Sequence, residues 1–115
     1  MICLNSKAIS SYRIYSICTI ENGKVIEELT YNDNEFMIIE LDNNDIIINN
    51  IHHSYVKYST DVIEFANDYY LKREYTYVRN KDLYKMNVLK RTTTLGTTFV
   101  VPLGKQTLLV YFSYD

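Results

Sequence analysis

Glycine, proline, cysteine and tryptophan are all scarce in this sequence. Its 115 residues include three glycines, one proline, two cysteines and no tryptophan. So little glycine and proline argues against a disordered or low-complexity chain. Two cysteines, Cys3 and Cys18, are too few for a disulfide framework. Each lies among apolar residues, so we expect it to pack as a small hydrophobe, with a cysteine pair or a reactive thiol as the alternatives.

Long apolar runs and an excess of one charge are also lacking. No segment approaches the roughly 20 apolar residues that span a bilayer, and residues 1–5 lack the basic and apolar stretches of a secretory signal. We therefore expect a cytoplasmic protein without a membrane partner. The net charge of −2 provides no overall field that would attract nucleic acid.

Apolar residues are plentiful enough for one ordinary core. They make up 47% of the chain, and the length suits a single domain covering residues 1–115. Ile, Asn, Lys and Tyr together supply 44 of the 115 residues. Because the codons of all four are AT-rich, this composition indicates an AT-rich genome, such as that of a virus, a phage or a low-GC bacterium.

Alternation and turn chemistry predict two hairpins in the first half of the chain. The first surrounds Asn22-Gly23, since both residues tolerate the positive φ of a tight turn, and strict alternation pairs Cys18 with Glu27. The second surrounds residues 42–45. Its predicted register places Glu40 opposite Ile47, on the face away from Ile46 and Ile48.

Two further hairpins are predicted in the second half. One surrounds Asn80-Lys81 and pairs Tyr77 with Tyr84. That register groups several residues on one inward face: Leu71, Tyr75, Tyr77, Tyr84, Met86 and Val88. The last hairpin surrounds residues 102–105. Its second strand, 107–112, is apolar on both faces, so we expect it to be central, to lie under a helix, or to form an oligomer contact.

One helix is predicted at about residues 60–71. Apolar residues there fall at positions 62, 63, 65, 66, 69 and 70, the spacing of a helix with one buried stripe. Asp61 can cap its N-terminus. The expected fold is therefore α+β, with an antiparallel sheet of about eight strands, strongly bent or closed into a partly open barrel, and one helix at about 60–71.

Charge is distributed unevenly along the chain. From Glu21 to Asp68 there are 11 acidic residues and two basic ones, whereas Lys72 to Arg91 holds seven basic residues and two acidic ones. Tyrosine and arginine dominate protein-binding hot spots, and aromatic rings beside cations also suit single-stranded nucleic acid or a nucleotide. The predicted partner-binding residues are Tyr70, Lys72, Arg73, Arg79, Lys81, Lys85 and Arg91.

Two simpler interpretations of this hairpin remain open. Its inward tyrosines can be core residues, and its basic side chains can be solvated or paired with the acidic half of the same chain. If Tyr75, Tyr77 and Tyr84 are core residues, the exposed part becomes a basic edge rather than an aromatic platform. That reduction favours docking guided by charge over base stacking.

Other candidate sites have weaker support in the sequence. The acidic residues Asp33, Glu35, Asp42 and Asp45 match no EF-hand spacing, so we predict no metal and no other cofactor. Adjacent His52 and His53 point to opposite faces of a strand and do not predict one catalytic or zinc site. The threonine-rich segment 92–98 lacks the glycine and lysine spacing of a phosphate-binding loop.

No catalytic motif is present, and the hypothesis is a non-enzymatic binding protein. It would act stoichiometrically on a host protein or protein complex through the basic hairpin, as a phage or viral accessory protein that inhibits a host defence system in the host cytoplasm. The alternatives are a nucleotide or single-stranded nucleic-acid binding module and, second, a small enzyme. A homodimer is a separate expectation, based on the uneven charge and on the two-sided apolar strand 107–112.

Overall fold

The structure is a computed structural model that describes residues 9–32, 35–41, 45–53 and 59–114. These residues form ten strands and no helix, so the protein is all-β. The predicted antiparallel sheet is confirmed, but the predicted α+β class is wrong. The strands are β1 (Ile9–Glu21), β2 (Lys24–Thr30), β3 (Met37–Leu41), β4 (Ile46–Ile48), β5 (Ile51–His53), β6 (Ser59–Phe65), β7 (Asp68–Arg79), β8 (Asp82–Thr93), β9 (Gly96–Pro102) and β10 (Thr107–Ser113).

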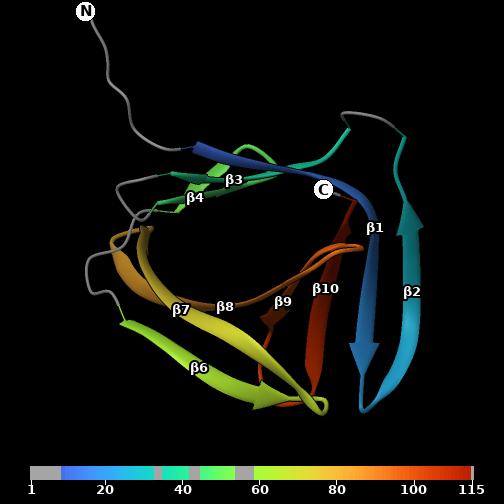
Figure 1. The fold of residues 1–115 in the computed structure, drawn as a ribbon. Helices are drawn as coiled ribbons and strands as arrows, with labels where there is room; N and C mark the ends of the chain where they lie inside the picture. Colours follow the sequence, from blue (N-terminus) through green and yellow to red (C-terminus); the bar gives the residue numbers. More distant parts are fainter. Residues whose placement is uncertain (1–8, 33–34, 42–44, 54–58, 115) are drawn as a thin grey trace, which may run out of the picture.

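All the strands belong to one antiparallel sheet. Their order is β5-β4-β3-β1-β10-β9-β8-β7-β6, and β2 pairs with β1 beside this path. Strand β1 bends sharply (Figure 1), because residues 9–13 pair with β3 whereas residues 14–21 pair with β10. The sheet consequently folds over itself, and β3 and β4 lie across the interior from β7, β8 and β9 (Figure 1).

The main core lies between these two parts of the sheet. Its buried members are Tyr12, Ile14, Ile17, Phe36, Ile38, Ile46, Ile48, Tyr75, Val88, Phe99, Val101 and Tyr111. A second apolar cluster centres on Leu89, Val100 and Val110, with half-buried side chains from β1, β6 and β7 packed against it. The central strands are thus covered on both faces.

Four tight turns explain most of the hairpins. Each has two central residues with φ between +48° and +78°, the left-handed pair required by the type I′ turn. The turn pairs are Asn22-Gly23, Asn49-Asn50, Ala66-Asn67 and Asn80-Lys81. Asparagine and glycine accept this conformation readily, whereas Ala66 and Lys81 adopt it at a steric cost.

The predicted helix at about 60–71 is wrong. This segment contains most of β6, the Ala66-Asn67 turn and the start of β7, and Ile63 pairs with Tyr70 across the hairpin. Half-buried Ile63 and Phe65 face the second cluster, while Val62 is exposed. The segment is rich in β-branched and aromatic residues, which favour strands. The turn between β6 and β7 contains no glycine or proline, so the sequence did not indicate that one strand ends and another begins there.

We expect Ala66→Gly to stabilise the protein. Alanine at φ +51° is strained, and glycine would relieve that strain, although its backbone loses more conformational entropy on folding. The free energy of unfolding should rise by about 0.5–1 kcal/mol in urea denaturation. Ser10→Gly, at an exposed extended position of β1, is the control and should lower it. A lower stability for Ala66→Gly would contradict the assigned turn.

A bulge in β1 sets which side chains enter the core. Ile14 pairs with Ser113 but Ser16 pairs with Phe112, so Tyr15 is an extra residue in β1. An extra residue reverses the alternation of the strand. For this reason Ile14 and Ile17, three positions apart, both lie in the main core.

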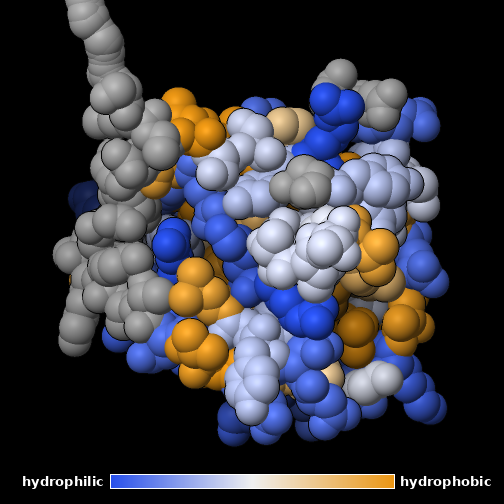
Figure 2. Space-filling model, in the orientation of Figure 1, coloured by the Kyte–Doolittle hydropathy of each residue, from blue (hydrophilic) through white to orange (hydrophobic). Residues whose placement is uncertain are grey.

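A second bulge changes the pairing of β2. The predicted pair of Cys18 with Glu27 is wrong, because Thr19 pairs with Glu27 and Cys18 with Glu28. Ile26 is the extra residue, and the whole of β2 is exposed. Apolar side chains gather at the right of Figure 2, over this strand. A bulge in an edge strand discourages further strands from adding to it.

The register between β3 and β4 also differs from the prediction. Glu40 pairs with Ile46, and Ile38 pairs with Ile48. The connection is longer than expected, and Leu41 N donates to the carbonyl of Asp45. This shift by one residue places Glu40 on the inward face, beside buried isoleucines.

Strand β10, the apolar segment at 107–112, is central in the sheet. It pairs with β1 on one side and with β9 on the other. Its two apolar faces are used within one molecule, since Tyr111 joins the main core and Val110 joins the second cluster. The strand therefore supplies no argument for a homodimer.

Candidate functional site

The β7–β8 hairpin has the register that its sequence predicts. Tyr77 pairs with Tyr84, and Leu71 pairs with Lys90. Tyr75 is only 1% exposed and lies in the core as predicted. Tyr84 was also predicted to be a core residue, and this prediction is wrong because Tyr84 is 42% exposed. The side chain of Tyr77 lies outside the described part of the structure.

Three of the predicted partner-binding residues contact acidic side chains of the same chain. Arg91 Nη2 lies 3.2 Å from Asp68 Oδ1. Arg73 Nη1 lies 3.6 Å from Glu40 Oε2. Lys85 Nζ lies 3.9 Å from Glu74 Oε1, and its side chain is mostly exposed, so this last contact contributes little and leaves Lys85 accessible.

Tyr70 and Lys72 lie away from the end of the hairpin. Tyr70 is half-buried with its ring edge-on to Phe65, and burial is the main cause that raises the pKa of its hydroxyl. Lys72 is half-buried and lies across from Asp61 in β6. The side chain of Arg79 lies outside the described part of the structure.

The two remaining predicted residues, Lys81 and Lys85, lie at the end of the hairpin. We call residues 80–85 the hairpin tip. All six are exposed, including Lys81 in the turn. Leu83 is 67% exposed and Tyr84 is 42% exposed. The tip therefore presents Leu83 and Lys85 on one face of β8 and Tyr84 on the other, with Lys81 in the turn and exposed Asp82 next to it. The seven predicted residues do not form one surface, because only Lys81 and Lys85 are shown at this tip.

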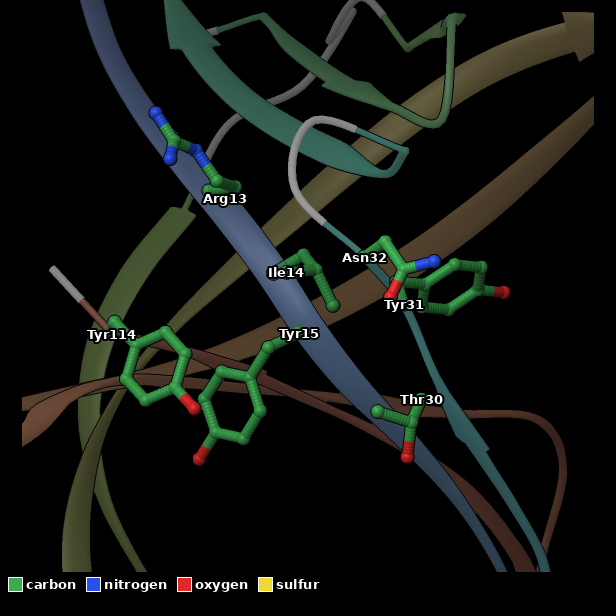
Figure 3. A pocket seen from close by; sticks show the side chains of 7 residues that line it. All are labelled: Arg13, Ile14, Tyr15, Thr30, Tyr31, Asn32 and Tyr114. Atoms are coloured by element: carbon green, nitrogen blue, oxygen red, sulfur yellow. The ribbon is translucent and has the colours of Figure 1, made fainter.

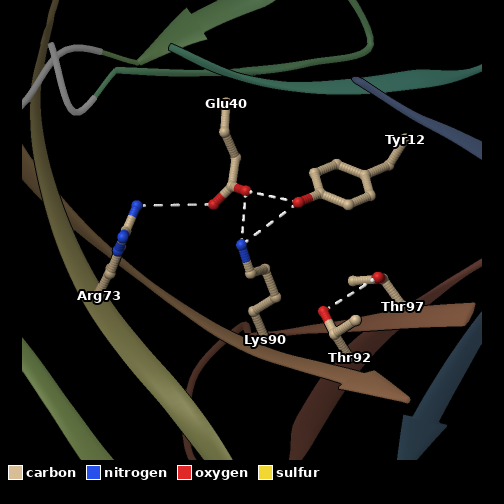
Figure 4. Close-up of polar contacts among 6 residues, drawn as sticks. All are labelled: Tyr12, Glu40, Arg73, Lys90, Thr92 and Thr97. Carbon is tan, nitrogen blue, oxygen red and sulfur yellow. Dashed lines mark hydrogen bonds and ion pairs between the residues drawn. The ribbon is translucent and has the colours of Figure 1, made fainter. Parts of the chain in front are cut away.

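A polar cluster that the sequence did not predict spans the interior (Figure 4). Lys90 Nζ donates to Glu40 Oε1 at 2.6 Å, and Tyr12 Oη donates to the same oxygen at 2.9 Å. Lys90 also lies 3.3 Å from Tyr12 Oη. With Arg73 on the other carboxylate oxygen, strands β1, β3, β7 and β8 meet at Glu40 (Figure 4).

This polar cluster connects strands on the two sides of the interior, and its groups are suited to a structural role. Burial and then Glu40 raise the pKa of Tyr12, so the hydroxyl remains a neutral donor. The side chains of Glu40 and Lys90 are 12% and 21% exposed, so their attraction is screened less than at the surface. Below the cluster, Thr92 and Thr97 share a hydroxyl hydrogen bond of 3.1 Å between β8 and β9 (Figure 4).

The two histidines have different surroundings, as their positions on one strand predicted. His52 Nε2 lies 2.9 Å from Asp45 Oδ2, within hydrogen-bonding distance. His53 is half-buried, and burial, followed by the neighbouring His52, lowers its pKa. Within the described ranges, no three His, Cys, Asp or Glu residues are grouped to hold a metal ion. Asp33 and Asp42 of the proposed acidic set lie outside those ranges.

The cysteine and threonine candidates add no reactive site. Cys18 is half-buried, and burial followed by Glu28 raises the pKa of its thiol, the opposite of an activated cysteine. Cys3 lies outside the described residues. Segment 92–98 is not a loop: it contains the end of β8, a short turn and the start of β9.

A pocket of about 300 Å³ opens beside the β1 bulge (Figure 3). We call it the tyrosine pocket; its lining residues are Arg13, Ile14, Tyr15, Thr30, Tyr31, Asn32 and Tyr114. In Figure 3 the rings of Tyr15 and Tyr114 lie together, and Tyr31 lies on the far side of Ile14. No signal in the sequence predicted it, because its residues come from three separate segments.

None of the described residues belongs to a helix that could cross a membrane. No family model, no curated protein and no solved structure matches this chain.

Proposed function

We propose that the protein is a non-enzymatic binding protein that docks on a macromolecular partner through the hairpin tip. The observation that carries this proposal is the exposure of Leu83 and Tyr84, on opposite faces of β8, beside Lys81 and Lys85. Apolar side chains at the centre of a contact, with charges around them, are typical of a protein interface. The matching partner surface is an apolar depression that receives both faces of the hairpin end and is bordered by carboxylates.

The rest of the hairpin supports docking over base stacking. Tyr75 is buried and cannot stack on a base, while Arg91 and Arg73 lie beside carboxylates of this chain. The acidic β6, with Asp61 and Glu64, lies next to β7 and would repel a phosphate chain. A protein partner that contacts only the hairpin tip avoids that repulsion.

The identity of the partner is a further part of the proposal. The AT-rich composition is the ground for placing the protein in a virus or phage, and the partner in the cytoplasm of its host. A small stoichiometric binder of this kind would act as an inhibitor of a host defence complex. Affinity purification from that host, followed by mass spectrometry, identifies the candidate partner.

Charge reversal at the tip tests the proposal. Lys81→Glu with Lys85→Glu should weaken binding of the purified partner at least tenfold, because both charges would face its carboxylates. The matched control is Lys24→Glu with Lys105→Glu, which makes the same charge change at exposed residues outside the tip. Binding is measured by surface plasmon resonance, and circular dichroism confirms that both variants are folded.

Leu83→Ala with Tyr84→Ala tests the apolar part of the same contact. Each truncation at the centre of an interface costs about 1–2 kcal/mol of binding free energy. The proposal is wrong if the two tip variants bind the partner as tightly as the unchanged protein. It is equally wrong if the control variant loses binding to the same extent.

A further inference from the structure

The tyrosine pocket is a feature of the backbone and not only of its side chains. Where β1 bulges at Tyr15, the Tyr15 carbonyl accepts from Tyr31 N at 2.8 Å, while Ile14 N donates to the Phe36 carbonyl at 3.0 Å. Within two residues, β1 therefore bonds both to the chain leaving β2 and to the chain entering β3. Backbone hydrogen bonds thus hold the segments that line the cavity in place, which lowers the cost of binding a ligand.

Aromatic rings supply the walls of this cavity. Tyr15 and Tyr114 are stacked with ring centroids 4.0 Å apart and an interplanar angle of 21°. Tyr31 packs against Phe36 at 5.4 Å, and Phe36 packs against Tyr111 at 5.6 Å. Burial raises the pKa of Tyr111 to about 12, so this supporting ring remains neutral. The walls are thus flat, and the one formed by Tyr31 is supported by packed core rings.

The charge among the described residues that line the pocket is positive, which favours an anionic ligand. Ile14 is fully buried at the floor, and Thr30 and Asn32 offer uncharged hydrogen-bonding groups. Among the described residues that line the pocket, Arg13 is the one with a charge, and no carboxylate is present. Figure 3 shows the Arg13 guanidinium directed away from the rings, and because this side chain is exposed, it can rotate toward an anionic group at the mouth.

We propose that the tyrosine pocket binds a planar aromatic molecule that carries an anionic group, of the class of nucleoside monophosphates. The ring lies against the face of Tyr15 or Tyr31, and Thr30 and Asn32 bond to its edge. The phosphate remains at the mouth, and the exposed Arg13 side chain turns toward it when the ligand binds. A volume of about 300 Å³ is at the lower limit of ligand pockets, which suits one base and excludes an oligonucleotide. This site is separate from the hairpin tip.

The test uses the folded chain and isothermal titration calorimetry with AMP, GMP, CMP and UMP, each beside its uncharged nucleoside. At least one monophosphate should bind with a Kd of about 1 mM or tighter. Its nucleoside should bind several-fold more weakly, because it lacks the partner of Arg13. Arg13→Gln should remove that difference without abolishing nucleoside binding, whereas Lys105→Gln, at an exposed lysine in the β9–β10 turn, should leave it unchanged.

Two tyrosine variants locate the ring. Tyr15→Ala should lower the affinity at least tenfold. If that variant is unfolded, Tyr114→Ala decides, since Tyr114 is 71% exposed at the end of the described chain and should lower the affinity about fivefold. Tyr84→Ala is the control. The proposal is overturned if no monophosphate binds saturably at 5 mM, or if binding is unchanged in Tyr114→Ala and Arg13→Gln.

Discussion

Gly96→Ala is expected to leave most of the protein unfolded or severely destabilised. Gly96 is buried where β8 turns into β9, with φ +146°, a conformation that residues with a side chain rarely adopt. An added Cβ would run into the backbone carbonyl oxygen of Ser113 at the end of β10. Because both elements are central in the sheet, neither can move without breaking strand pairing. We expect a loss of about 3 kcal/mol or more in the free energy of unfolding.

Gly104→Ala is the matched control for this prediction. Gly104 also has a positive φ, +110°, but nothing lies within 4 Å of an added Cβ. Its substitution should therefore cost only the backbone strain, about 1 kcal/mol. Urea denaturation followed by circular dichroism measures both variants. Equal losses for the two glycines would show that the close approach of β10 does not determine the effect.

Glu40→Gln is expected to have the second largest effect. The substitution keeps the size of the side chain but removes the carboxylate that Lys90 and Arg73 both contact. The ammonium of Lys90 would then remain largely buried without an opposite charge. We expect a loss of about 2–3 kcal/mol, somewhat below that of a fully buried pair because these side chains are partly exposed.

Two comparisons separate this effect from a general loss of charge. Glu28→Gln, on exposed β2, should change the free energy of unfolding by less than about 0.5 kcal/mol. Glu40→Leu combined with Lys90→Met should recover much of the loss, because an apolar pair requires no charge compensation. If Glu40→Gln unfolds at the same urea concentration as the unchanged protein, the cluster does not hold the two parts of the sheet together.

The structure separates the basic hairpin into a structural part and an exposed part. Arg73 and Arg91 contact Glu40 and Asp68, so part of the acidic half of the chain neutralises part of the basic half. Lys81 and Lys85 are exposed at the tip. This division explains how a chain with net charge −2 can carry opposite charges in successive segments and still fold. It also limits the proposed docking surface to the tip.

The β7–β8 hairpin could be predicted closely from its sequence. A two-residue turn at Asn80-Lys81 determines the register, and regular alternation over 12 residues on each side leaves one pairing that buries Tyr75 and Val88 together. The exposure of Tyr84 could not be predicted in this way. Alternation states which face a side chain occupies, but not where along the strand the opposing layer ends.

The false helix and the missed pocket have different causes. Apolar positions 62, 63, 65, 66, 69 and 70 fit a helical stripe and also two short strands around a turn, and pairing with β7 and β8 decided between them. The pocket depends on an extra residue at Tyr15, and on its meeting with Tyr31 and Tyr114 from distant segments. Periodicity within one segment carries no information about such a meeting.

The sequence alone determined that the chain forms hairpins, where several of them turn, and that strand 107–112 could be central. Local physics suffices for these features, because turn conformations and alternation involve residues close along the chain. Only the tertiary structure decided that segment 60–71 is extended, that Glu40 faces the interior, and which lysines remain exposed at the tip. Each of these depends on which distant strand lies opposite, and one added residue in a strand reverses the answer.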